Sequence, residues 1–253
     1  MISKIYFPGS SGVRICGILS APSEKKKEPV TILCHGFASG KDSGTNIRLE
    51  EFLRGQGLHS LRFDFFGHGE SGGDFSEITV SRSVDDVRAA HNFLRGCGYR
   101  RFGLVGSSFG GLVSILAASE LEGLETLALK SPVSDCLSRL FESNGEWDIP
   151  LWKGQGYHTY MDFEGKERRL DYKFYEDAAQ RCGYDAAVRI DIPTLIVHGE
   201  EDEIVPVLQS IRLAELIPDC RLHIIPGADH RYSEPDLFER MIGLFESFIL
   251  DRS

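Results

Sequence analysis

One serine of this chain stands where it could act as a nucleophile. Ser108 lies in the pentapeptide 106–110, Gly-Ser-Ser-Phe-Gly, after an apolar run at 102–105 and ahead of a helical pattern at 112–121. A G-x-S-x-G pentapeptide between a strand and a helix holds its serine at the tip of a sharp turn. Side chains beside that serine would clash, which explains Gly106 and Gly110, and Gly111 would let the helix pack closely. The motif therefore predicts nucleophilic catalysis by Ser108.

A serine hydroxyl at neutral pH needs a base, and the base needs an acid that orients it. His230 is the predicted base, because it follows a strand-like run at 221–225 and a parallel sheet places its ligand site beyond the carboxyl ends of its strands. The acid should follow another strand end. Of the four acidic residues after the run at 194–197 we choose Asp202, with Glu201 and Glu203 as its competitors.

The transition state would carry an oxyanion, which two backbone N–H groups should bind. One belongs to Phe109, at the start of a helix whose positive dipole end faces the same point. The other should come from His35-Gly36-Phe37, which follows a strand at 30–34, and the N–H of Phe37 is our candidate. This chemistry requires no metal and no organic cofactor.

Short apolar, β-branched runs alternate with helical patterns along the chain. Strand, helix and strand in repetition predict an α/β protein with a mostly parallel sheet and helices on both faces. Two further runs, 2–7 and 13–20, follow each other without a helix and should form an antiparallel edge. A charged stretch at 23–28 is predicted to be a solvated hairpin turn. The predicted strands are 30–34, 60–65, 102–105, 127–129, 194–197 and 221–225, and the predicted helices are 47–54, 83–95, 112–121, 207–216 and 235–250.

A long insert, 133–192, interrupts this alternation. Eight aromatic residues lie among the 31 residues from 145 to 175, whereas aromatics make up 10% of the whole chain. A surface loop would not hold so many, so the insert should fold into a small cap on a core formed by 1–132 and 193–253. The aromatics fit an aromatic substrate pocket and a plain hydrophobic interior of the cap equally well. The candidate substrate contacts are Trp147, Trp152, Tyr157 and Tyr160.

Composition and charge limit the classes of function. The 253 residues, 42% hydrophobic and 26% charged, are ordinary for a soluble globular protein of one or two domains. The net charge of -10 argues against a nucleic acid or an anionic membrane as partner. No run approaches the ~20 apolar residues of a membrane helix, the N-terminus lacks the apolar run of a signal peptide, and the six scattered cysteines fit a reducing compartment. We expect a cytoplasmic protein, and the sequence leaves a homodimer open.

Taken in order, these motifs resemble the landmarks of the α/β-hydrolase superfamily, and they extend from residue 35 to residue 230. Ser108, Asp202 and His230 follow one another in the order nucleophile, acid, base that this superfamily uses. The resemblance implies an α/β-hydrolase fold with an eight-stranded sheet. The matching segments are His35-Gly36-Phe37, Asp64-Phe65-Phe66-Gly67-His68-Gly69-Glu70-Ser71, Gly106-Ser107-Ser108-Phe109-Gly110-Gly111, His198-Gly199 with Asp202, Val205-Pro206 and Asp229-His230.

The resemblance also implies roles for residues around the site. In that family the segment that contains Asp64 and His68 is a structural turn beside the site, and His35 and His198 would be positioning residues. Chain length and the place of the insert are most similar to the small bacterial esterases of the feruloyl or cinnamoyl type, in which an inserted cap holds an aromatic acyl group. Ser107 departs from that pattern, because many relatives carry histidine there.

The predicted activity is hydrolysis of small-molecule carboxylic esters through an acyl-enzyme, with hydroxycinnamoyl or short-chain acyl groups as substrates. A serine at the turn argues against the chemistry of dehalogenases and epoxide hydrolases, which need a carboxylate there. Three alternatives stay open. They are a thioesterase or lipase for longer acyl chains, a serine peptidase, and a non-catalytic ligand receptor on a hydrolase scaffold.

Overall fold

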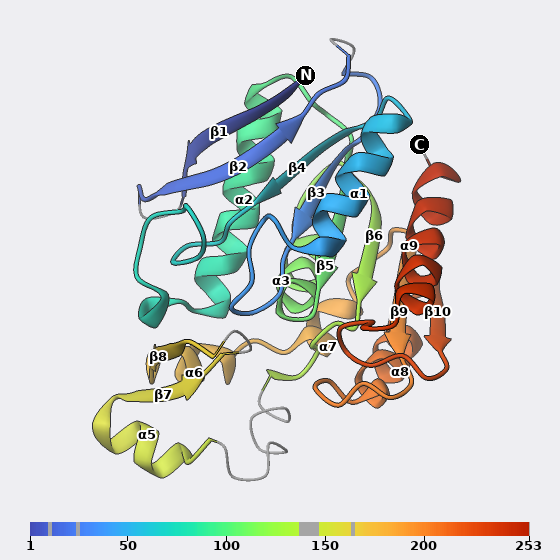
Figure 1. Cartoon of the computed structure of the whole chain (residues 1–253). Coiled ribbons are helices and arrows are strands. Elements are labelled where there is room, and N and C mark those ends of the chain that lie inside the picture. Colours follow the sequence, from blue (N-terminus) through green and yellow to red (C-terminus); the bar gives the residue numbers. More distant parts are fainter. Residues whose placement is uncertain (10–11, 24–25, 137–146, 163–164, 253) are drawn as a thin grey trace.

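The structure is a computed structural model that describes residues 1–9, 12–23, 26–136, 147–162 and 165–252. Its strands and helices alternate along most of the chain (Figure 1). The strands are β1 (Ile2–Pro8), β2 (Arg14–Ser20), β3 (Val30–Cys34), β4 (His59–Phe63), β5 (Phe102–Ser107), β6 (Leu124–Lys130), β7 (Tyr157–Met161), β8 (Glu167–Asp171), β9 (Thr194–Gly199) and β10 (Cys220–Ile225). The helices are α1 (Gly44–Gly55), α2 (Val80–Gly96), α3 (Phe109–Ala118), α5 (Ile149–Gln155), α6 (Lys173–Ala178), α7 (Gly183–Ala187), α8 (Val207–Leu216) and α9 (Pro235–Leu250), with a short 3-10 helix η1 (Phe75–Glu77).

Eight of these strands form one sheet in the order β1-β2-β4-β3-β5-β6-β9-β10. Neighbours from β4 to β10 in this order are parallel, whereas β2 is antiparallel to both β1 and β4. The predicted mostly parallel sheet with an antiparallel edge is therefore confirmed. Because the central strands run in one direction, the loops that follow β3, β5, β6, β9 and β10 all leave from the same end of the sheet.

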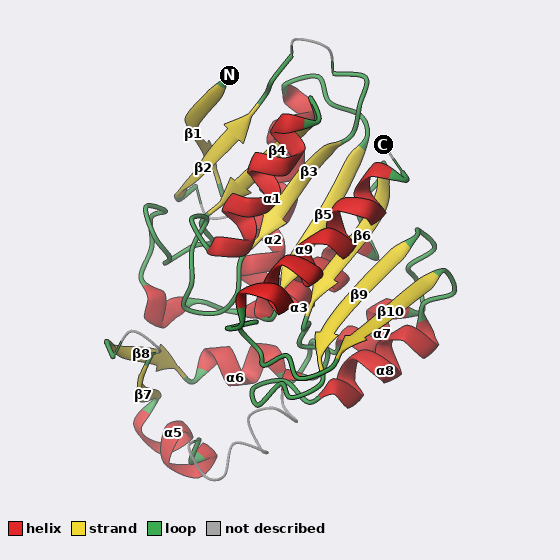
Figure 2. Cartoon of the chain, turned by 45° about the vertical axis from the view of Figure 1, so that its right-hand side comes forward, coloured by secondary structure: helices red, strands yellow, loops and turns green. Residues whose placement is uncertain are grey.

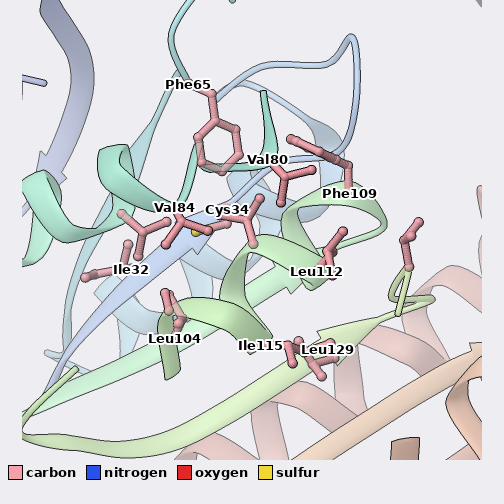
Figure 3. Packing of buried hydrophobic residues seen from close by; sticks show 14 of the residues in the cluster. Ile32, Cys34, Phe65, Val80, Val84, Leu104, Phe109, Leu112, Ile115 and Leu129 are labelled. Atoms are coloured by element: carbon pink, nitrogen blue, oxygen red, sulfur yellow. The ribbon is translucent and has the colours of Figure 1, made fainter. Parts of the chain in front are cut away.

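Helices cover both faces of the sheet, and successive strand residues contact opposite layers. Leu33 packs in a cluster with α1 and α9, whereas Ile32 and Cys34 pack in a second cluster with α2 and α3. This alternation follows from the two-residue period of a strand, and it explains why the central strands are mostly apolar on both faces. Figure 2 shows α1 and α9 on the near face, and Figure 3 shows part of the second cluster, in which Val84 of α2 and Leu112 of α3 face strand residues.

The insert between β6 and β9 contributes a second, two-stranded sheet of β7 and β8. This hairpin, α5 and α6 lie beyond the carboxyl ends of the large sheet (Figures 1 and 2). The N–H of Ser81, in α2, donates to the Asp177 carboxylate of α6 at 2.8 Å, which ties α6 to the core. By contrast, α7 packs between α3 and α8 in the helical layer. The residues 137–146 and 163–164 of the insert lie outside the described residues.

One prediction about the sheet edge was wrong. The charged stretch at 23–28 was expected to be a hairpin turn, but β4 lies between β2 and β3 in the sheet. The segment therefore crosses over one strand position, because β2 pairs with β4 and β3 pairs with the other edge of β4. Residues 24–25 of this stretch lie outside the described part. Within the described ranges, no helix combines the length and the apolarity that crossing a bilayer requires.

Candidate active site

Ser108 is the residue at which β5 turns into α3. Its backbone has φ 53° and ψ -116°, a conformation that side-chain-bearing residues rarely adopt. Both flanking glycines are required by space: a Cβ at Gly106 would lie 2.4 Å from the Gly110 carbonyl oxygen, and one at Gly110 would lie 2.3 Å from the His35 carbonyl oxygen. A Cβ at Gly111 would lie 2.7 Å from Pro132, beyond β6, so this glycine allows the close approach of α3 to the adjoining loop.

The structure brings Ser108, His230 and Asp202 together from three loops at the carboxyl end of the sheet. Nε2 of His230 lies 3.1 Å from Oγ of Ser108. Nδ1 of the same ring lies 2.7 Å from Oδ2 and 2.9 Å from Oδ1 of Asp202. A carboxylate can only accept, so Nδ1 carries the proton and Nε2 is left to accept a proton from the serine hydroxyl. This arrangement has the geometry of a nucleophile, base and orienting acid.

The Asp202 carboxylate is fully buried, yet it is held in the charged form. Burial alone would raise the pKa of Asp202, but hydrogen bonds from His198 and His230 and the backbone N–H of Val205 hold that pKa well below its ordinary value. Oδ1 accepts the N–H groups of Ile204 and Val205 at 2.9 and 2.7 Å. His198, expected to be a positioning residue, lies with Nε2 3.2 Å from Oδ2. Asp202 is thus an anion whose orientation is fixed by the loop that carries it.

The two competitors for the acid stand elsewhere in the same loop. Glu201 is exposed, and within the described residues its carboxylate makes no hydrogen bond with the His230 ring. Glu203 is also exposed, but its Oε2 accepts the backbone N–H of His230 at 3.2 Å. Glu203 therefore contacts the main chain of the base rather than its imidazole.

The loop after β3 lies against the turn at Ser108. A Cβ at Gly36 would lie 3.5 Å from the Cβ of Ser108. In the described chain, the N–H groups of Phe37 and Phe109 donate to no recorded protein acceptor, as an oxyanion site requires. His35 holds the loop in place: its Nε2 accepts the N–H of Phe65 at 3.1 Å, so its Nδ1 carries the proton and donates to the carbonyl oxygen of Gly36 at 2.8 Å. Burial and the nearby His68 lower the pKa of His35, so the ring stays neutral.

A buried ion pair anchors the far end of this loop. Nζ of Lys41 lies 2.8 Å from Oδ2 of Asp64 and 2.9 Å from Oε1 of Glu70. The backbone N–H of Lys41 donates to Oδ1 of Asp64 at 2.7 Å. Burial alone would lower the pKa of Lys41, but the hydrogen bonds to Asp64 and Glu70 raise it above its ordinary value. His68 is neutral as well, because burial lowers its pKa to about 4. Asp64 and His68 are both buried, in the segment that the family resemblance describes as a structural turn beside the site.

A cavity of about 520 Å³ opens at Ser108. Aromatic rings form much of its wall: the Phe37 ring lies 5.7 Å from that of Phe109, 6.0 Å from that of Tyr160 and 5.7 Å from that of Phe174, measured between centroids. Polar groups lie among them. Those that line the cavity besides Ser108 and His230 are Ser39, Ser43, Thr45, Ser107, Lys130, Asp162 and Arg231.

The four aromatic residues proposed as substrate contacts occupy different places. Trp147 and Tyr160 line the cavity, with ring centroids 5.4 Å apart. Trp152 is completely buried, and its indole N–H donates to the carbonyl oxygen of Leu170 at 3.0 Å. Tyr157 is not among the described residues that line the cavity, and the Arg169 guanidinium lies 4.2 Å from its ring centroid. A hydrophobic interior of the cap therefore accounts for Trp152, whereas Trp147 and Tyr160 stay candidate substrate contacts.

Backbone strain gathers around this site. Among the described residues, the non-glycine residues with positive φ are Ala38, Ser108, Ser131 and Tyr232. Ala38 lines the cavity next to Phe37, and Ser131 follows the last residue of β6. Tyr232 follows the base by two residues. Each such conformation costs on the order of 1–3 kcal/mol.

Lys130 is a residue of the site that the sequence patterns did not single out. It is the last residue of β6, it is 7% exposed, and its Nζ donates to the carbonyl oxygen of His230 at 2.9 Å. Desolvation lowers the pKa of its ammonium to about 8. One feature of the sequence could have identified Lys130: a charged residue directly follows the apolar run 127–129, at the carboxyl end of a buried strand.

The chain matches the family model described as "Alpha/beta hydrolase family" over residues 31–241. The chain belongs to this family. As an α/β hydrolase it has the expected fold, and the predicted resemblance to that superfamily is confirmed. The match includes the turn at Ser108, the acid loop with Asp202 and the loop that carries His230.

Several characterised proteins are similar to this α/β hydrolase along most of their length. A structure of Est1E from Butyrivibrio proteoclasticus with bound ferulic acid has a TM-score of 0.85 and 26% identity, with 98% of each chain covered. The alpha/beta hydrolase domain-containing protein 10 from mouse has a TM-score of 0.83 and 26% identity, with 99% of this chain and 100% of that chain covered. In sequence, the "Palmitoyl-protein thioesterase ABHD10, mitochondrial" of Rattus norvegicus is 28% identical over an alignment of 227 positions, which covers 83% of this chain and 71% of the relative.

Proposed function

We propose that this α/β hydrolase cleaves carboxylic esters through an acyl-enzyme on Ser108. The observation that carries the proposal is the continuous hydrogen-bonded row from Ser108 Oγ through His230 to the buried Asp202 carboxylate, at the edge of an aromatic-walled cavity. A serine without this row would be a weak nucleophile at neutral pH. The catalytic roles of the three residues are part of the proposal.

The first half of the reaction forms the acyl-enzyme. Nε2 of His230 takes the proton of the Ser108 hydroxyl as the oxygen attacks the ester carbonyl carbon. The carbonyl oxygen becomes an oxyanion, which the N–H groups of Phe37 and Phe109 bind. Asp202 stabilises the imidazolium that forms, because its carboxylate already lies 2.7 Å from Nδ1. The C–O bond then breaks, and His230 returns the proton to the leaving alcohol.

The second half releases the acid. Water enters next to His230 and gives up a proton to Nε2 as it attacks the acyl carbon. The same two N–H groups bind the second oxyanion. The bond to Ser108 Oγ breaks, and the proton on His230 passes to that oxygen, which restores the starting state. Besides the ester and one water molecule, these steps use only groups of the chain.

We propose a planar aromatic acyl group as the substrate. Phe37, Tyr160 and Trp147 line the same cavity as Ser108. Contacts between a bound aromatic ring and such side chains contribute about 0.5–1.5 kcal/mol beyond the area they bury. The bound ferulic acid of the Est1E structure supports the same choice. We further propose that the insert 133–192 acts as the cap, through the described elements α5, β7, β8 and α6 at the mouth of the site.

A second candidate is hydrolysis of long-chain acyl thioesters. The observation that favours it is the thioesterase named in the sequence comparison, together with the apolar wall of the cavity. The same catalytic groups serve both reactions, because the attacked carbon is an acyl carbon in each. The two candidates differ in the acyl group and the leaving group, so a substrate panel separates them.

The panel contains p-nitrophenyl esters from acetyl to palmitoyl, methyl esters of hydroxycinnamic acids, palmitoyl thioesters and aminoacyl amides. We expect the highest kcat/KM on hydroxycinnamoyl esters. Ser108→Ala should fall below about 10⁻³ of the wild-type rate. Ser119→Ala, at the other end of α3, is the matched control and should keep full activity. Full activity of Ser108→Ala would contradict the mechanism, and a preference for palmitoyl thioesters would favour the second candidate.

The cellular compartment is likewise proposed. We infer the cytoplasm, because Cys16, Cys34, Cys97, Cys182 and Cys220 are thiols without a disulfide bond in the structure. The rat relative is named as a mitochondrial protein, which makes fractionation of the source cells the direct test. Recovery of the chain in an organelle or outside the cell membrane would contradict this compartment.

A further inference from the structure

Lys130 stands in the sheet between the strand of the nucleophile and the strand of the acid. In β6 it pairs in register with Ser107 of β5 on one side and with Val197 of β9 on the other. Ser107 directly precedes Ser108, and β9 leads into the loop that carries Asp202. Lys130 is therefore the strand residue that lies next to both of these loops.

This lysine contacts the nucleophile and the base through two different atoms. Its backbone carbonyl oxygen accepts the N–H of Ser108 at 2.9 Å. Its Nζ donates to the carbonyl oxygen of His230 at 2.9 Å. A single residue thus links the main chains of Ser108 and His230, independently of the hydrogen bond between their side chains.

His230 needs such a link because it lies in a loop. In the described chain, the recorded partners of its main-chain groups are side chains: the N–H donates to Oε2 of Glu203 at 3.2 Å and the carbonyl oxygen accepts from Nζ of Lys130. Asp202 fixes the direction of the imidazole, and these two side-chain contacts hold the main chain of His230 itself. Two residues earlier, the carbonyl oxygen of Ala228 accepts the backbone N–H of Glu201 at 3.0 Å, which ties the same loop to the Asp202 loop. Glu203 is exposed and Lys130 is buried, so the lysine is the more rigid of the two supports.

Burial of the Lys130 ammonium is unfavourable, because its surroundings do not compensate for its lost hydration. Nζ lies 4.9 Å from the centroid of the Tyr232 ring, and the charged groups that act on it are Asp202, Asp229 and Arg231. Desolvation nevertheless outweighs the attraction of the two carboxylates and lowers the pKa to about 8. A methionine would fill the same space without this penalty, so packing alone gives no reason for a lysine here.

We propose that Lys130 is a positioning residue, which holds the His230 loop at the distance from Ser108 that proton transfer requires. The proposal rests on the proposed function, because it assigns Lys130 a task in that same reaction. Lys130 borders the cavity, but in this scheme it acts through the His230 loop and takes no part in the proton transfer. Displacement of the base by about 1 Å would cost on the order of 100-fold in rate.

The test compares Lys130→Met with wild type and with the matched control Lys27→Met, which removes an exposed lysine at the opposite end of β3. For Lys130→Met we expect kcat to fall about 10- to 100-fold with KM little changed. We also expect its melting temperature to equal or exceed that of wild type, because a buried charge is removed. A residue with a merely structural role would lower the melting temperature instead. Lys130→Arg keeps a charged donor and should recover part of kcat.

Labelling of Ser108 by a fluorophosphonate separates this proposal from the one it rests on. Wild type should be labelled, Ser108→Ala should not, and Lys130→Met should be labelled more slowly by the same factor as kcat. Absence of labelling in folded wild type would overturn both proposals. Labelling of wild type and Lys130→Met at equal rates would overturn the role of Lys130 alone, and so would a loss of kcat that merely follows a loss of folded protein. If Lys130→Met does not fold, Lys130→Gln takes its place with the same criteria.

Discussion

Replacement of Asp202 by asparagine should reverse the proton arrangement of the base. Oδ1 of Asp202 accepts two backbone N–H groups, from Ile204 and Val205, at 2.9 and 2.7 Å. In Asp202→Asn the amide oxygen must take this place, because an NH₂ group cannot accept. The NH₂ group then faces Nδ1 of His230, which has to act as acceptor. The ring proton moves to Nε2, 3.1 Å from Ser108 Oγ, where it blocks uptake of the serine proton.

Asp202→Asn should lose activity because His230 no longer acts as a base, and not because the protein unfolds. The asparagine is isosteric, and it keeps both backbone contacts. A wrong tautomer costs about 10⁴ in kcat in serine hydrolases with this triad, which corresponds to about 5 kcal/mol of transition-state stabilisation. We therefore expect Asp202→Asn to lose about 10⁴ in kcat/KM while KM changes little.

The assay is steady-state hydrolysis of the best ester of the panel, with Glu203→Gln as the matched control. Glu203 also contacts His230, but a glutamine oxygen can still accept the backbone N–H. That variant should change kcat/KM by about twofold or less. The reasoning would be refuted if Asp202→Asn kept more than about a tenth of the wild-type activity, or if both variants lost activity equally.

Three further outcomes are expected. The pKa of Lys130 is about 8 in the folded chain and 10.5 in the unfolded chain. Between these two pH values only the unfolded chain binds the proton. The free energy of unfolding should therefore rise by about 3 kcal/mol as the pH increases through this range. Denaturant titrations of Lys130→Met should lack this rise, and an equal rise would contradict the assignment. Gly110→Ala should lower the free energy of unfolding by at least about 1–3 kcal/mol, because its Cβ would meet the His35 carbonyl oxygen. Gly243→Ala, where α9 has open space, should raise the free energy of unfolding by up to about 1 kcal/mol. Equal shifts of Tm in the two variants would refute this reasoning. Trp147→Ala should raise KM for hydroxycinnamoyl esters about tenfold and leave acetyl esters unchanged; equal changes in both would exclude Trp147 from the acyl pocket.

The sequence was sufficient to predict the parts of the molecule that repeat a simple physical pattern. Strands such as Val30–Cys34 are buried on both faces, so their composition identifies them without any partner. The glycines at 106 and 110 report a steric demand that is local to one turn. Ser108, Asp202 and His230 each follow a strand, and parallel strands bring their ends together, so their meeting follows from the chain order.

Contacts between distant side chains could not be predicted in this way. Lys130 reaches a carbonyl oxygen one hundred positions away, and no local pattern records such a contact. The side-chain positions in the insert are equally hard to predict from sequence, because Trp147 and Trp152 are the same residue type and lie close together in the chain. One lines the cavity and the other is fully buried, since their positions depend on how α5 and β7 fold against the core. The prediction of a hairpin at 23–28 was wrong because the order of strands depends on the whole sheet, and β4 lies between β2 and β3.

The four strained residues around the site, Ala38, Ser108, Ser131 and Tyr232, have a consequence for the engineering of heat-resistant variants. Glycine adopts a positive φ without penalty, so a selection for survival at high temperature should find substitutions at these positions attractive. Each such gain would also loosen a segment that holds the proposed nucleophile, base or oxyanion donors. Stability and turnover therefore compete at these four positions, and libraries aimed at durability should leave them unchanged.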